Sequence, residues 1–188
     1  YKNLGAGGRF FFIKKNYSDA MKLMELYLEL PKNEIWCNRD DLISNKLNVL
    51  SAYIYQKSAY LNGEFDKVKR YIDITKNDSV LRESVIELLI NTAEKTKDTT
   101  EMLNYLYLGL EEYPTHTFYF SKLYEYFIQI DKDDSAYLLA DSLSKLYPDT
   151  CLYSSSKVLP LINMCEYEEA IKIGEEVLNK DTTLTELH

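Results

Sequence analysis

The residues best suited to bind a transition metal are three cysteines and two histidines, and their spacing does not favour a metal site. Cys37, Cys151 and Cys165 are far apart, and none belongs to a Cys-x-x-Cys pair. His116 and His188 likewise have no cysteine or second histidine close to them in the sequence. Because structural zinc sites use closely spaced Cys and His ligands, we expect no bound metal. We interpret the cysteines as small, mostly buried apolar side chains, with at least one free thiol.

Residues that could catalyse a reaction also lack the neighbouring residues that catalysis would need. Gly5-Ala6-Gly7-Gly8 resembles a phosphate-binding loop in composition, but no strand precedes it and no Lys-Ser/Thr follows it. His116 has no Ser or Cys partner near it in the sequence. Acidic pairs fall at turns or helix starts, where they favour the helix dipole: Glu111-Glu112, Asp133-Asp134 and Glu168-Glu169. We predict that the chain is not an enzyme and uses no cofactor.

The charge of the 188 residues is unevenly distributed. Residues 1–97 hold 16 Lys and Arg against 13 Asp and Glu, whereas residues 98–188 hold 6 against 17. An acidic half repels phosphate backbones, so we expect no nucleic-acid partner. The acidic surface is open to two interpretations, attraction of basic protein segments or solubility alone.

The chain shows no signal for membrane insertion. No apolar run approaches the roughly 18 residues that a transmembrane helix needs, and the first residues lack a signal-peptide pattern. Because the chain starts with Tyr1 rather than Met, we interpret it as processed or trimmed, and the missing targeting segment does not decide the compartment. We expect a soluble segment of unknown oligomeric state.

Long helices are the elements that must position these residues. The chain has only 6 Gly and 4 Pro, and its aromatic residues are mainly tyrosines, 17 against 7 Phe and 1 Trp. Few helix breakers and many amphipathic rings favour helices and exclude a β-sandwich with frequent Gly/Pro turns or a disordered tail.

An internal period of 34 residues runs along the chain. Pro114 and Pro148, each preceded by Tyr, are 34 residues apart. The residues twelve positions before them belong to a longer series with intervals of 48, 34, 34 and 34: Ala20, Val68, Met102, Ala136 and Ala170. The first interval equals one period plus an insertion of 14 residues, so the sequence predicts a helical repeat protein.

Each period contains two helical patterns. The third period places Ile86, Leu89, Ile90 and Ala93 on one apolar face. Its second helix begins at Asp98, which is predicted to cap the helix together with Glu101, and ends before Pro114. Pro160 falls within the first helix of the last period and should kink or shorten it.

The chain thus resembles the tetratricopeptide repeat (TPR) family, whose unit is a 34-residue helix-turn-helix. The best matches are Asn16-Tyr17-x-x-Ala20, Gly63-Glu64-Phe65 and Glu166-Tyr167-x-x-Ala170. The resemblance implies an all-α fold, a right-handed α-solenoid of about five stacked antiparallel helix pairs in a single domain, 1–188. The pairs are expected at approximately 1–31, 45–77, 79–113, 115–147 and 150–181, with an insertion loop at 31–44. Other α-solenoids of similar period are the structural alternative.

The register predicts roles for several residue types. Gly7 and Gly8 fall where first helices of TPR units carry small residues for close packing. Seven tyrosines fall at architectural positions, five in packing slots and two before prolines: Tyr17, Tyr27, Tyr55, Tyr124, Tyr167, Tyr113 and Tyr147.

In such a solenoid the first helices line a concave groove. Side chains one position after each core stripe should face it: Tyr53, Lys57, Tyr60, Glu87, Asn91, Glu94, Ser121, Glu125, Ile128, Ser155, Leu159 and Ile162. This set would fit an extended segment with an aromatic or acidic end and a basic stretch, or it is the polar decoration of a solvated face. Glu87 and Glu94 flank Asn91, which argues against the TPR class that binds terminal carboxylates.

The insertion at 31–44 holds the only tryptophan, Trp36. Insertions in repeat proteins often map to the binding face, so Trp36 is a candidate recognition residue. The alternative is that it packs over neighbouring helices.

These features predict a protein–protein interaction scaffold that binds a peptide or protein segment in its groove. The alternative is a structural spacer or dimerisation segment of a larger TPR protein, without a peptide ligand. The composition resembles that of bacterial TPR proteins, several of which act in the cell envelope, so periplasm and cytoplasm both stay open.

Overall fold

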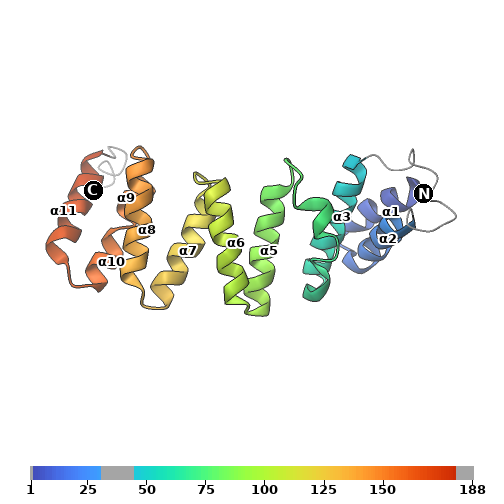
Figure 1. The fold of residues 1–188 in the computed structure, drawn as a ribbon, viewed down its shortest axis with the longest axis horizontal. Coiled ribbons are helices and arrows are strands. Elements are labelled where there is room, and N and C mark those ends of the chain that lie inside the picture. The colour runs from blue at the N-terminus through green and yellow to red at the C-terminus, as the bar shows by residue number, and fades with distance from the viewer. Residues whose placement is uncertain (1, 31–44, 181–188) are drawn as a thin grey trace. The chain divides into compact units, whose positions relative to one another are not determined.

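A computed structural model describes residues 2–30 and 45–180, and within these ranges it contains helices and turns but no strand (Figure 1). The chain divides into two compact units, Tyr1–Tyr113 and Pro114–His188. The elements of the first unit are α1 (Lys2–Ile13), α2 (Tyr17–Glu29), α3 (Asn45–Leu61), η3 (Phe65–Lys67), α4 (Ile72–Thr75), α5 (Arg82–Thr96) and α6 (Thr99–Glu112). Those of the second are α7 (Thr117–Gln129), α8 (Asp133–Leu146), α9 (Cys151–Ser155), α10 (Val158–Asn163) and α11 (Tyr167–Lys180).

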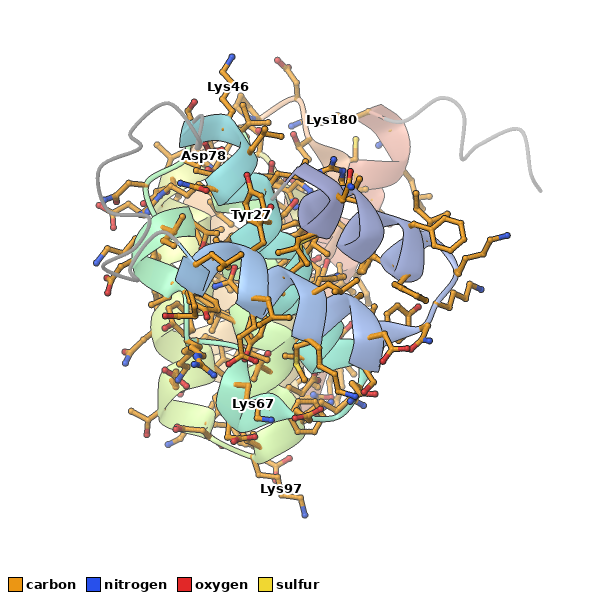
Figure 2. The ribbon with its side chains drawn as sticks, turned by 90° about the vertical axis from the view of Figure 1, so that its right-hand side faces the viewer. Tyr27, Lys46, Lys67, Asp78, Lys97 and Lys180 are labelled. Carbon is orange, nitrogen blue, oxygen red and sulfur yellow. The ribbon has the colours of Figure 1, made fainter. Side chains whose placement is uncertain are left out.

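The turn inside each helix pair contains one residue with a left-handed backbone. These residues have φ values between 55° and 79°: Lys15, Gly63, Lys97, Asp131 and Cys165. Each lies five positions before a member of the sequence series, so the backbone repeats with the same intervals of 48, 34, 34 and 34. Figure 2 shows Lys97 projecting away from its turn, which leaves a charged side chain in solvent at this position. The repeat predicted from the sequence is therefore confirmed at the level of the backbone.

Two backbone hydrogen bonds close each of these turns in a Schellman arrangement. After α5, the N–H of Lys97 donates to the carbonyl of Glu94 at 3.2 Å, and that of Asp98 to Ala93 at 2.9 Å. The same two bonds recur at the other four turns. The Asp98 carboxylate then accepts from the N–H of Glu101 at 3.0 Å, which confirms the predicted Asp98 cap of α6. The expected return bond from Glu101 is wrong, because the Glu101 carboxylate binds Lys69 and the N–H of Asp98 donates to Ala93.

The first pair packs closely because glycines of α1 lie against α2, the helix beside it in Figure 1. A Cβ atom on Gly8 would lie 2.7 Å from Cε of Met24, and one on Gly7 would lie 3.1 Å from Cδ1 of Leu23. A larger side chain at either position would require the Met24 or Leu23 side chain to move. The predicted packing role of these two glycines is confirmed.

The second pair differs from the two regular helices expected over 45–77. After α3 the chain forms η3, a turn and the short helix α4, and several N–H groups bond three residues back rather than four. Two side chains anchor this segment. The Tyr71 hydroxyl donates to Glu29 at 2.6 Å, and the Thr75 hydroxyl donates to Oε1 of buried Gln56 at 3.1 Å. These tertiary contacts override the helical pattern.

The second unit contains the predicted break in its last pair. Residues 156–157 separate α9 from α10, and Pro160 occupies the first turn of α10. Proline has no N–H to donate to the carbonyl four residues earlier, that of Ser156. The hydroxyl of Tyr124 donates to that carbonyl instead, at 2.8 Å. The expected shortening by Pro160 is confirmed.

Tyrosines also join elements within this unit. The ring of Tyr153 meets Phe120 edge to face at 4.8 Å, and its hydroxyl donates to the carbonyl of Pro114 at 3.1 Å. Tyr167, by contrast, is 56% exposed on the outer side of α11, so its expected place in a packing slot is wrong. Trp36, Cys37, His188 and the insertion loop 31–44 lie outside the described residues.

Candidate functional site

The candidate site is the surface of α3 and α5, two first helices of the first unit that pack against each other. On α5 the predicted stripe is buried, since Ile86, Leu89, Ile90 and Ala93 are at most 4% exposed. The side chains one position later therefore emerge at the edge of the buried face. On α3 the buried residues Ala52, Gln56 and Ala59 have the same relation to Tyr53, Lys57 and Tyr60.

Tyr53 is the residue through which the two helices meet at this surface. It is half-buried, and Ser84 and the carboxylate of Glu87, both on α5, lie near its hydroxyl. Burial raises the pKa of Tyr53, and the negative charge of Glu87 raises it further, whereas the nearby Ser84 hydroxyl partly opposes both. The hydroxyl of Tyr53 is therefore neutral at physiological pH and suited to hydrogen bonding.

The other predicted residues of these helices line the same surface. Lys57 and Asn91 are half-buried, and Glu94 is exposed. Tyr60 packs against the core of the unit and lies 5.8 Å from the ring of Phe65. Tyr53 packs against the same core, so both tyrosines combine an anchored ring with a polar tip. We call this set of six residues the α3–α5 face: Tyr53, Lys57, Tyr60, Glu87, Asn91 and Glu94.

The remaining predicted groove residues lie in the second unit. Ser121 and Ile128 of α7 are half-buried and Glu125 is exposed. Ser155, Leu159 and Ile162 of the last pair are exposed as well. Their role in binding stays a prediction.

Ser84 was not singled out from the sequence, although a signal was present. It lies three residues before Glu87 and so shares its helix face. The groove residues predicted on α5 are Glu87, Asn91 and Glu94, and none of them lies in the first turn of the helix, where Ser84 is. Its position near the Tyr53 hydroxyl is what gives Ser84 its place in the site.

The described histidine and cysteines all lie in the second unit. His116 is exposed at the N-cap position of α7, with its ring 5.4 Å from that of Tyr119. Cys151 is half-buried and Cys165 exposed, both as free thiols, so the interpretation of the cysteines as mostly buried is wrong for these two. None of the described helices is both long and apolar enough to cross a membrane.

Comparison with solved structures decides the fold type. A crystal structure of MamA aligns with 100% of this chain and 97% of its own, with 12% identity and a TM-score of 0.64. A second MamA structure gives a TM-score of 0.61 at 13% identity, over 95% and 96%. TPR-like repeats of a putative kinesin light chain from Podospora anserina align over 98% and 96%, with 11% identity and a TM-score of 0.56. The fold is of the TPR type.

The predicted fold class, an all-α TPR-like solenoid, is thereby confirmed. No family model and no curated protein matches the sequence. In TPR arrays the first helices of successive units line the concave side. The α3–α5 face belongs to two such first helices, those of the second and third pairs.

Proposed function

We propose that the chain is a non-catalytic protein-interaction scaffold that binds an extended peptide segment on the α3–α5 face. The observation that carries this proposal is that Tyr53 and Tyr60 of α3, both packed against the core, lie on one surface with Glu87 of α5 near Tyr53. Anchored tyrosines lose little side-chain entropy on binding, because their rings are already held by the core. Such residues are common at the centres of binding surfaces.

The charges of the face define the peptide expected there. Lys57 lies between the two tyrosines on α3, whereas Glu87 and Glu94 lie on α5. A segment with an acidic or aromatic residue against α3 and basic residues against α5 would pair with both helices. Ser121, Glu125 and Trp36 are proposed as further contacts.

Peptide display tests this proposal and does not depend on the identity of the partner. Random peptides are selected on the immobilised 188-residue chain, and the affinity of enriched peptides is measured by fluorescence anisotropy. A double exchange, Lys57→Glu with Glu94→Lys, reverses the charge pattern while keeping the net charge. We expect it to weaken binding by at least about tenfold, or about 1.4 kcal/mol.

The matched control is a second exchange at exposed positions outside the face, Lys132→Glu with Glu111→Lys. It also keeps the net charge and should leave binding unchanged. Enriched peptides that bind the first exchange variant as tightly as the original chain would refute the α3–α5 face as the binding surface. A selection that enriches no peptide would favour the alternative role as a spacer or dimerisation segment.

A further inference from the structure

Helix α11 exposes an apolar face opposite its buried one. Tyr167, Ile171 and Leu178 of α11 share one side of the helix and are 56%, 62% and 42% exposed. With Val158 and Ile162 of α10 they line a shallow groove of about 440 Å³ whose lining is almost wholly apolar. We call this groove the tail groove. An apolar depression of this kind on the surface of a helical repeat indicates a docking surface.

The packing of the first unit shows what this groove would accept. There α3, a first helix, packs mainly against α2 and also touches α1. The first helix of one pair therefore packs on the second helix of the preceding pair, close to the first helix of that preceding pair. In the last pair α11 is the second helix, and α10 is the adjacent part of the first helix. The tail groove is thus shaped for one more first helix.

The chain contains a first helix with an exposed apolar side, α1. Its inner side packs closely on α2, where Gly8 lies against Met24. On its outer side Phe10 is 56% and Ile13 is 76% exposed, and exposed Ala6 lies on the same side because the three residues are spaced at i, i+4 and i+7. We call Ala6, Phe10 and Ile13 the head ridge.

The charges around the two surfaces are opposite. Residues 2–16 contain Lys2, Arg9, Lys14 and Lys15 and no acidic residue. Residues 166–180 contain five glutamates against two lysines, and one of the glutamates, Glu175, borders the tail groove. The surroundings of the head ridge of one copy therefore attract those of the tail groove of another copy, whereas two head ridges or two tail grooves repel each other. The charges therefore favour a head-to-tail contact over a symmetric one.

We infer that a second copy of this chain is the occupant: its head ridge on α1 docks into the tail groove between α10 and α11. The contact joins two different surfaces, so it is heterologous and leaves one free head and one free tail in each dimer. Copies then add one after another, and the assembly grows with concentration. This inference is independent of peptide binding on the α3–α5 face.

Sedimentation velocity on the 188-residue chain and two point variants tests the inference. Phe10→Glu inactivates the head and Ile171→Glu inactivates the tail, because each places a charge in an apolar contact. We expect the unmodified chain to form larger species as its concentration rises, and each variant alone to stay monomeric. An equimolar mixture of the two variants retains one intact head and one intact tail, so it should form a dimer and nothing larger.

Leu138→Glu on α8 is the matched control, since Leu138 is 61% exposed and belongs to neither surface. It should associate like the unmodified chain, and circular dichroism should show the same helicity for all variants. A chain that stays monomeric at every concentration overturns the inference, as does a Phe10→Glu variant that still dimerises, which indicates a symmetric contact. A chain that associates only after removal of residues 181–188 assigns the groove to that segment and overturns it too.

Discussion

Among single residues, Gly63 has a backbone conformation that a residue with a Cβ atom adopts only at a cost in free energy. Its φ of 79° is left-handed, and a Cβ atom added to it would meet nothing within 4 Å. Gly174, inside α11, also has open space around it but has an ordinary helical backbone. The two glycines therefore differ in backbone conformation and not in steric room.

The first prediction compares these two glycines. Gly63→Ala should lower the free energy of unfolding by about 1–2 kcal/mol, the cost of a left-handed backbone with a Cβ atom. Gly174→Ala should raise it by about 0.5–1 kcal/mol, because alanine is the better helix former. Urea denaturation followed by circular dichroism measures both. Shifts of the same sign would contradict the left-handed turn at Gly63.

The second prediction concerns the charged pair formed by Arg82 and Glu112. The guanidinium of Arg82 binds both carboxylate oxygens of Glu112 and so links the start of α5 to the end of α6. This hydrogen bonding holds the pKa of Glu112 below 4.5. A carboxyl group with a lowered pKa in the folded state stabilises the fold at higher pH, and that contribution is lost as the pH falls through the folded pKa.

Glu112→Gln should therefore cost up to about 1 kcal/mol of unfolding free energy at pH 7. The difference in unfolding free energy from the unmodified chain should narrow as the pH falls below about 4.5, since Glu112 is then protonated first in the unfolded state and, at lower pH, in the folded state as well. Urea titrations over this pH range measure the gap. Glu111→Gln, at an exposed neighbouring position, is the control and should give a small gap at every pH. If the loss of unfolding free energy caused by Glu112→Gln does not change with pH, the Arg82–Glu112 ion pair does not stabilise the fold as predicted.

Among the elements, α9 and α10 show how a break in one helix is compensated by another. Pro160 removes the donor for the carbonyl of Ser156, and the Tyr124 hydroxyl of α7 replaces it at 2.8 Å. Tyr124→Phe should cost about 0.5–1.5 kcal/mol, because it leaves that carbonyl without this partner. In a Pro160→Ala background the cost should be smaller, since residue 160 then has its own N–H to donate.

A double-mutant cycle of Tyr124→Phe and Pro160→Ala measures this coupling from four urea denaturation curves. A coupling free energy near zero would contradict the compensation. Tyr126→Phe, on the same helix and also half-buried, is the control and should show no coupling to Pro160→Ala.

The sequence predicted elements well where the apolar period and the caps agreed. The buried stripe of α5, the Asp98 cap and the end of α6 before Pro114 are local features, and all three are confirmed. The segment after α3 was predicted less well, because Tyr71 and Thr75 are held by Glu29 and Gln56, which are distant in sequence. The position of Ser84 near Tyr53 likewise depends on how α3 and α5 pack, which no local pattern specifies.

At the scale of the whole molecule, each unit has a core of its own. The core of the first unit includes Met24, Tyr55, Tyr71, Val85 and Leu88, which come from α2, α3, the segment before α4, and α5. In the second unit the hydroxyl of Tyr153 bonds to the carbonyl of Pro114, the first residue of that unit. A cut between residues 113 and 114 therefore keeps these contacts intact on both sides.

The last prediction is that residues 1–113 fold on their own. Repeat units are stabilised by contacts with their neighbours, so a fragment that ends after a complete pair keeps its core. A fragment of residues 1–81 is the matched control, because it lacks α5 and with it Val85 and Leu88. We expect 1–113 to be helical and to unfold cooperatively in urea, and 1–81 to show a much weaker, broader transition. Equal behaviour of the two fragments, both unfolded or both cooperative, would contradict a core completed by α5.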